Sequence, residues 1–174
     1  MTKRMWIVPM LALLLVPAMA QAQFKQGDWE LTLNGSGANG PDFDGTNFSV
    51  GGSLGYFLTD EFEIALRQSI GYNDRGVSGG NLNGSTRIAV DYNFNLGQFV
   101  PYIGANIGYV YGDSVNDTFE GGPEGGVKYF VNQSTFIFLS VEYQFFFDSG
   151  DSDDLNEAFS DGQFLYGLGI GFKF

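Results

Sequence analysis

The stretch from residue 162 to residue 174 reads GQFLYGLGIGFKF, and it decides the class of fold. Large apolar side chains occupy every second position from Phe164 to Phe174, while glycine, Gln163 and Lys173 fill most of the positions between them. Only an extended strand sorts such a period of two onto separate faces, because a helix has 3.6 residues per turn. The stretch therefore predicts an amphipathic β-strand.

Seven further segments upstream show the same alternation. Each is close to the 9 to 11 residues that a tilted strand needs to cross the hydrocarbon layer of a membrane. In chain order the segments are Asp28–Asn34, Thr46–Phe57, Phe62–Tyr72, Ser85–Phe94, Val100–Tyr111, Pro123–Val131 and Thr135–Phe147. With the last stretch they make eight predicted strands.

The connections between these strands alternate in length. Short turns at one end and long loops at the other are typical of membrane barrels. The short connections are 58–61, 95–99 and 132–134, and the long ones, rich in glycine and aspartate, are 35–45, 73–84, 112–122 and 148–161. The sequence therefore predicts an all-β fold, an eight-stranded antiparallel up-and-down transmembrane β-barrel with both termini on the side of the short turns.

A soluble eight-stranded barrel of the lipocalin kind is the main alternative fold. It would bury its apolar face and expose its polar face to water. Here the polar face contains many glycines, which suits a narrow interior, and aromatic residues concentrate near strand ends, as in the girdles of membrane barrels. These aromatic residues are Tyr56, Tyr72, Tyr92, Tyr109, Tyr111, Phe147 and Phe174. The pattern favours the membrane barrel.

The first residues have the order of an export signal. Two basic residues precede the apolar run Met5–Val16, and small residues follow it. This order is typical of a secretory signal peptide, and we expect cleavage after Ala22, with Ala20 as the alternative site. A retained transmembrane helix would need about 20 apolar residues. The predicted domains are a cleaved signal peptide, 1–22, and an outer-membrane β-barrel, 23–174.

The composition narrows the function classes. The formal charge is -12, which argues against nucleic-acid binding because that function calls for clustered lysine and arginine. The chain has no cysteine, so neither a disulfide nor a lipid-modified cysteine is expected. The 17% aromatic content and 26 glycines suit a barrel in a membrane better than a water-soluble domain.

Three stretches resemble a known family. They are VPYIGANIGY at 100–109, GGVKYF at 125–130 and GLGIGFKF at 167–174. They resemble the OmpA/OmpX-like outer-membrane β-barrel domain, over essentially the whole predicted barrel. The resemblance implies a location in the bacterial outer membrane and a role in envelope integrity or adhesion. Because the sequence stops at Phe174, we expect no peptidoglycan-binding domain like that of OmpA.

The C-terminal residues resemble an assembly signal. Phe174, with Phe172 two positions before it, is similar to the C-terminal motif that the barrel assembly machinery of the outer membrane reads. The same two residues also fit the end of an ordinary amphipathic strand.

Charged residues of the polar face are predicted to line the lumen. They are Glu30, Glu63, Arg67, Arg87, Asp91, Glu124, Lys128, Glu142 and Lys173. An unpartnered buried charge is strongly unfavourable, so we expect these groups to pair, with Arg67 and Arg87 beside Glu63 and Asp91. Side chains fill the interior of an eight-stranded barrel, so the first interpretation is a polar plug. The alternative is a narrow, cation-leaning ion path.

The long connections carry candidate binding residues. Three of their aromatic side chains are candidates for contact with an extracellular ligand, with packing on the barrel rim as the more common alternative: Phe43, Phe119 and Phe159. The acidic run 148–157 offers oxygen ligands for Ca²⁺ or Mg²⁺, but its spacing does not fit an EF-hand, and a solvated acidic loop is the expected outcome. We therefore expect no metal site and no cofactor.

The composition also argues against an enzyme. The chain has no histidine and no cysteine, which excludes Ser-His-Asp and Cys-His sites and histidine-ligated zinc. A lipid-modifying enzyme is therefore the least favoured class. The first hypothesis is a structural or surface-interacting protein, and the second is a small pore for solutes or ions. Expected partners are outer-membrane lipids and lipopolysaccharide, the assembly machinery, and an extracellular ligand at the outer loops.

Overall fold

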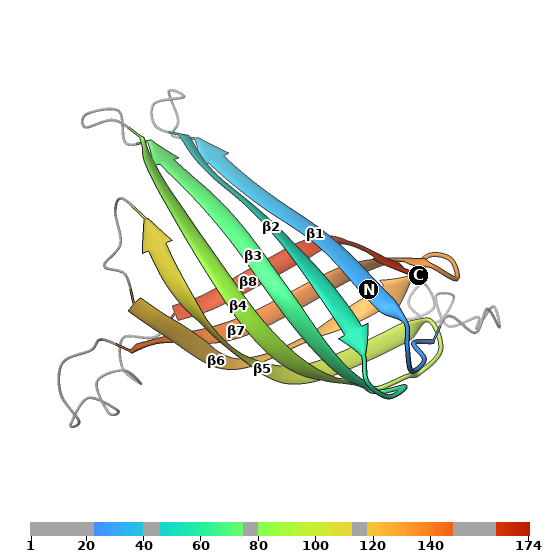
Figure 1. Ribbon diagram of the computed structural model, residues 1–174. Helices are drawn as coiled ribbons and strands as arrows, with labels where there is room; N and C mark the ends of the chain where they lie inside the picture. The colour runs from blue at the N-terminus through green and yellow to red at the C-terminus, as the bar shows by residue number, and fades with distance from the viewer. Residues whose placement is uncertain (1–22, 40–45, 75–79, 113–117, 148–162) are drawn as a thin grey trace, which may run out of the picture.

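The computed structural model describes residues 23–39, 46–74, 80–112, 118–147 and 163–174. Its strands form a closed antiparallel barrel in which each strand pairs with its neighbours in sequence and β8 returns to β1 (Figure 1). The predicted eight-stranded fold is confirmed. The strands are β1 (Trp29–Asn39), β2 (Thr46–Phe57), β3 (Phe62–Asp74), β4 (Asn81–Asn93), β5 (Phe99–Gly112), β6 (Thr118–Phe130), β7 (Thr135–Phe147) and β8 (Gln163–Lys173).

The barrel has two distinct ends. Short turns join β2 to β3, β4 to β5 and β6 to β7 at one end, where Phe174 also exchanges backbone hydrogen bonds with Trp29. We call this the turn end. The ends of β1, β3, β5 and β7 that lead into the long connections lie at the opposite end, which we call the loop end (Figure 1).

Several strands extend further toward the loop end than predicted. β1 continues to Asn39, beyond the predicted limit at Asn34, and β4 already begins at Asn81. Glycine and asparagine in these extensions have low strand propensity. Pairing with the neighbouring strand nevertheless holds them in the sheet, where Asn39 lies opposite Thr46 and Asn81 lies opposite Asn73. Local composition alone therefore underestimated the length of the wall.

β6 differs most from its prediction. It begins at Thr118, so Pro123 lies inside the strand and opposite Ala105 of β5, not at the strand start. Proline has no N–H for the ladder and is normally confined to strand starts, edge strands and bulges. The earlier start also brings Glu120 into the barrel wall, on the same face as Glu124.

The outer surface of the barrel is apolar, with an aromatic belt near each end. Leu66, Ile103 and Ile107 are among the exposed aliphatic side chains between the belts. The cross-strand aromatic pairs have ring centroids 4.7 to 5.6 Å apart: Trp29–Tyr56, Phe62–Tyr92 and Phe99–Tyr129 at the turn end, and Phe48–Tyr72, Tyr109–Phe119 and Tyr143–Phe164 at the loop end. Such belts are typical of barrels that span a membrane. Within the described residues, no helix is long and apolar enough to cross a membrane.

Glycines on the inner face of β8 make room for the side chains of β7. Phe136 lies opposite Gly171, and Phe138 lies opposite Gly169. A Cβ atom added to Gly169 would lie 2.6 Å from the Phe138 ring, which is closer than packed atoms approach. The glycines that alternate along β8 therefore allow two phenylalanine rings to enter a narrow lumen.

Candidate functional site: the barrel lumen

The charged residues predicted for the lumen lie on the inner face of the wall, and most of them are buried. Asp91, Glu63 and Lys128 have only 1 to 3% of their surface exposed. The side chains form three groups along the barrel, each centred on one cation, and Lys173 lies apart from them at the turn end.

The first group surrounds Lys128 of β6, near the turn end. Its ammonium donates hydrogen bonds to Glu30 of β1 at 2.6 Å and to Glu63 of β3 at 3.0 Å. The ring centroids of Phe24 and Tyr102 lie 4.9 Å and 5.1 Å from the same nitrogen. One cation therefore joins three strands and contacts aromatic faces that favour it electrostatically.

The second group surrounds Arg67 of β3. The guanidinium donates to Asp91 of β4 at 2.7 Å and to Glu124 of β6 at 2.5 Å. Asn106 of β5 donates a further hydrogen bond of 2.6 Å to Glu124. Charge-assisted bonds of this kind are about twice as strong as neutral ones. They connect four consecutive strands of the wall.

The third group lies nearest the loop end. Arg87 of β4 donates to both carboxylate oxygens of Glu142 on β7, at 2.7 and 2.6 Å. Its Nε lies 3.8 Å from Glu120, which accepts a hydrogen bond from the hydroxyl of Ser85. This pair spans the lumen from one wall to the other.

The pairing of these charges differs in part from the expectation. Arg67 contacts Asp91 as expected, but Glu63 is bonded to Lys128, and Arg87 reaches Glu142 instead of Asp91. The expectation considered only adjacent strands. In a narrow barrel with tilted strands, side chains from opposite walls lie equally close, so partners distant in sequence compete successfully.

Lys173 fixes the start of the barrel domain to its last strand. Its ammonium lies 3.2 Å from the Asp28 carboxylate and donates a 2.8 Å hydrogen bond to the backbone carbonyl of Gln23. The side-chain amide of Gln23 in turn donates to the carbonyl of Asn95. The residues that precede β1 are therefore held across the turn end.

An aromatic cluster closes the lumen at the turn end. We call Phe24, Phe57, Phe130 and Phe136 the aromatic plug; all four are at most 1% exposed. The rings of Phe24 and Phe57 are stacked with centroids 4.1 Å apart, and Phe24 meets the other two edge to face. Lys128 lies over this cluster, so the plug continues directly into the first charge group.

Sequence reasoning missed the aromatic plug and Glu120. The sequence did contain a signal, because residues an even number of positions apart in a strand share a face. Phe57 shares its face with Ser53, and Phe136 shares its face with Glu142. Both rings thus stand on the polar, inward face. Phe24 had no such signal, since it precedes the first strand.

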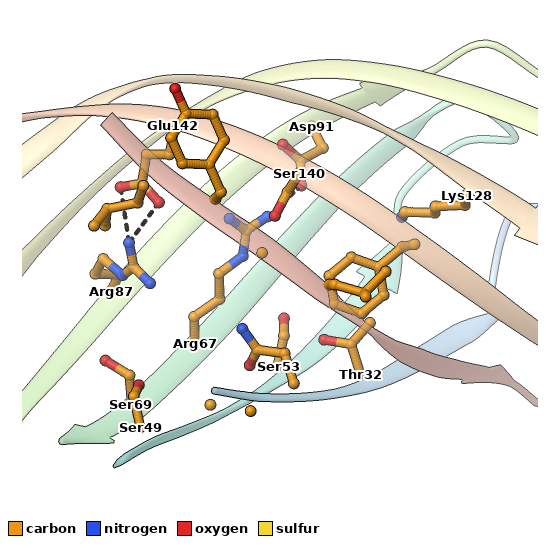
Figure 2. A pocket seen from close by; sticks show the side chains of 18 of the residues that line it. Thr32, Ser49, Ser53, Arg67, Ser69, Arg87, Asp91, Lys128, Ser140 and Glu142 are labelled. Atoms are coloured by element: carbon orange, nitrogen blue, oxygen red, sulfur yellow. Dashed lines mark hydrogen bonds and ion pairs between the residues drawn. The ribbon is translucent and has the colours of Figure 1, made fainter. Parts of the chain in front are cut away.

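A chamber occupies the remaining part of the lumen. It has a volume of about 480 Å³ and is bounded by β1, β2, β3, β7 and β8, together with the inner ends of the charge groups. Figure 2 shows the hydroxyl groups of Thr32, Ser49, Ser53 and Ser69 on one side of it and the Arg87–Glu142 pair on the other. Within the described ranges, no group of three or more acidic side chains is arranged to hold a metal ion.

The remaining candidate residues have varied positions. Phe172 and Phe174 point outward at the turn end, at the edge of the aromatic belt. Phe119 was expected in a loop, but this is wrong: it lies on β6, points outward and packs against Tyr109. The following candidates lie outside the described residues: Phe43, Phe159, the acidic run 148–157 and the signal 1–22.

The family of the chain follows from its sequence profile. The model of the outer membrane protein beta-barrel domain matches residues 8–174. The chain belongs to this family. The predicted membership among small outer-membrane barrels is therefore confirmed, and the apolar outer surface with its two belts is the surface that such a barrel presents to lipid.

Relatives of this outer-membrane barrel agree with the assignment. Outer membrane porin F of Pseudomonas aeruginosa is 26% identical over 137 residues, which is 71% of this chain and 37% of that protein. The solved N-terminal β-barrel domain of OprF from the same organism has a TM-score of 0.59 and 22% identity, with 86% of this chain and 98% of that domain covered. Neisserial surface protein A has a TM-score of 0.53 and 16% identity, with 84% and 92% covered.

Proposed function

We propose that this outer-membrane barrel is a non-conducting, non-enzymatic structural protein that anchors its long connections at the cell surface. The observation that carries the proposal is that the lumen is closed along its axis at the turn end. Phe24, Phe57, Phe130 and Phe136 are at most 1% exposed at the turn end, and ion pairs cross the interior above them. Side chains normally fill an eight-stranded barrel in this way. We place the barrel in the outer membrane with its turn end facing the periplasm and its loop end facing outward.

The ion pairs argue against a standing pore. Moving Lys128 aside would strand Glu30 and Glu63 as buried, unpaired carboxylates, and moving Arg67 would do the same to Asp91 and Glu124. Breaking a buried pair in this way costs about 3 to 5 kcal/mol. Opening a path through both groups and the plug is therefore strongly disfavoured.

A small pore is the second candidate function. It is favoured by the chamber of about 480 Å³, a space inside the lumen that side chains do not fill. A relative that is 26% identical also carries the name porin. In this alternative the plug would be one state of a gate.

Conductance of the refolded protein in a planar bilayer tests the two functions. The natural protein is expected to give no discrete openings. Replacing Phe57 and Phe136 with serine removes two rings of the plug and provides the comparison, with folding checked by heat-dependent electrophoretic mobility. Openings of the natural protein that change in size in R67Q or R87Q would overturn the structural function and establish the pore.

Surface interaction would depend on the long connections. Phe43 and Phe159 are the apolar candidates for contact with an extracellular ligand, among acidic neighbours that also suit divalent cations bridging to lipopolysaccharide. Replacing both with serine should reduce binding of purified barrel to its target cells or lipopolysaccharide vesicles. Unchanged binding would remove these residues from the proposal.

Export and assembly complete the proposed function. We expect the signal peptide to be cleaved after Ala22, which N-terminal sequencing of the protein from membranes would test. Phe172 and Phe174 are proposed as the motif read by the assembly machinery. Replacing Phe174 with serine should lower the folded fraction in the outer membrane while leaving refolding in detergent unchanged.

A further inference from the structure

The seam between β1 and β8, which closes the barrel, is paired over only about half of its length. β1 and β8 pair over five residue pairs, from Glu30–Lys173 to Asn34–Gly169. All other neighbouring strands pair over ten or more. Both strands continue beyond the last pair, β1 as Gly35–Asn39 and β8 back to Gln163. At 3.4 Å per residue, the unpaired part of β1 is about 17 Å long.

The unpaired half lies at the loop end, and Figure 1 shows β1 and β8 diverging there, although they meet at the turn end. The chamber reaches this gap, because its lining includes Asn34 and Gly35 on one lip and Leu165, Gly167 and Leu168 on the other. The lumen is therefore closed along its axis at the turn end but open sideways, between two strands of the wall.

An open strand edge conflicts with a hydrocarbon environment. Backbone N–H and C=O groups without partners cost several kcal/mol each in lipid, which is why transmembrane barrels normally have no edge. The outer surfaces beside the gap are apolar, since Leu168 and Phe164 are 66% and 60% exposed. An occupant of the gap must therefore offer hydrogen-bonding groups toward the chamber and apolar surface toward the membrane.

We propose that the gap between β1 and β8 is a lateral binding site for a single-chain amphiphile with a neutral, hydroxyl-rich head group. The head group lies in the chamber, where Thr32, Ser53 and Ser140 supply hydroxyl partners. The acyl chain leaves between the lips, past Leu165 and Leu168, and lies along the outer surface. A volume of about 480 Å³ is in the range of small-molecule sites.

The charges of the lumen select a neutral head group. The described inner face carries more carboxylates than cations, which disfavours an anion. Around Arg67 the carboxylates stand behind the cation: the Asp91 and Glu124 side chains are 2% exposed, whereas that of Arg67 is 19% exposed. A cation entering the chamber would therefore meet the guanidinium first.

Cysteine pairs across the seam test its geometry. The natural chain has no cysteine, so engineered pairs are free of competition. L33C/I170C links two residues that are paired in the structure. G35C/L168C links the two residues that would pair two positions further along, where the hydrogen-bonding type of the pair would be the same. A disulfide needs Cα atoms about 4.4 to 6.8 Å apart. In lipid bilayers L33C/I170C should oxidise at least tenfold faster, and equal rates would overturn the open seam.

Quenching by a brominated monoacylglycerol tests occupancy. In a Trp29→Phe background, L165W reports from the lip of the chamber, and I107W reports from the lipid-facing surface of β5 on the far wall. In phosphatidylcholine nanodiscs with a low fraction of the brominated lipid, quenching of L165W should be at least threefold stronger and should saturate. Adding T32V and S53A should reduce that excess, because it removes hydroxyl partners.

Two results would overturn the lateral site. Equal, non-saturating quenching at both positions would show ordinary lipid contact only. Intermolecular disulfides formed by the single variant G35C would show that a second copy covers the seam. Heat-dependent mobility verifies that each variant is folded. The site is independent of the proposed structural function, because conductance along the axis and quenching at the seam are separate readouts.

Discussion

At the scale of single residues, Lys128 connects the two parts of the lumen. It is 3% exposed, holds Glu30 and Glu63, and lies over the ring of Phe24. Strand parity predicts that Lys128 points inward, but parity says nothing about its partners. Those partners lie on β1 and β3, and only the curvature of the closed wall brings them to β6.

Replacing Lys128 with methionine should destabilise the barrel strongly. The variant keeps a similar apolar stem but leaves two buried carboxylates without a cation, which costs about 3 to 5 kcal/mol. Urea unfolding of the refolded barrel in lipid vesicles, followed by the fluorescence of Trp29, measures the loss. The triple variant K128M/E30Q/E63Q should recover a large part of it, and a triple variant as unstable as K128M would contradict this origin.

At the scale of elements, the contact of β7 with β8 depends on glycine. A side chain at Gly169 would collide with the Phe138 ring of β7 and, more closely still, with the backbone carbonyl oxygen of Leu33 on β1. Replacing Gly169 with alanine should cost about 1 to 3 kcal/mol, the usual penalty for overpacking. The matched control is Gly71→Ala on β3, where the nearest atom to the added carbon is a carbonyl oxygen 4.0 Å away. Urea midpoints that fall equally in both variants would show that backbone freedom matters and packing does not.

The segment before β1 also contributes to the packing of the barrel, although it has no regular secondary structure. Phe24 is 1% exposed and stacks on Phe57, so Phe24→Ala leaves a cavity beside Lys128. Such truncations cost about 3 to 5 kcal/mol. The control Leu96→Ala, at a turn residue that is 69% exposed, should change stability by less than about 0.5 kcal/mol. An equal effect of both changes in chemical denaturation would show that the plug adds no stability.

At the scale of the whole molecule, stabilising contacts are unevenly distributed along the barrel axis. The turn end combines the aromatic plug with paired strands all round, whereas the loop end has a wall that is open between β1 and β8. Regions with fewer backbone partners open more easily. The two halves of one seam should therefore behave differently, although they belong to the same two strands.

Hydrogen exchange should reveal this difference. Amides of Gly35–Asn39 and Phe164–Leu168 that point into the seam should exchange at least tenfold faster than those of Glu30–Asn34 and Gly169–Lys173, because they lack a partner strand there. Mass spectrometry of the barrel in nanodiscs resolves these segments. The loop-end part of β3 with β4, which is paired to Asn73–Asn81, is the control for fraying at strand ends. Uniform protection along the β1–β8 seam would contradict the open half.

The period of two along the sequence determined where the strands lie and, apart from Glu120, which charged side chains point inward, and the alternating lengths of the connections determined the antiparallel order. These properties are local, because alternation in an extended chain directly assigns each residue to a face. The alternation therefore predicted the class of fold and the nine charged residues that line the lumen. Applied to the aromatic residues, the same alternation would also have placed Phe57 and Phe136 on the inner face. The ends of β1 and β6 were missed because pairing, not composition, extends them.

The tertiary structure alone decided the contacts made through space. Arg87 meets Glu142, Lys128 meets Glu30, and Phe24 inserts beneath them, because tilt and closure set which positions of opposite walls face each other. The half-paired seam also depends on closure. The sequences of β1 and β8 are those of ordinary strands. Only the relative positions of these two strands in the closed barrel determine where the pairing between them ends.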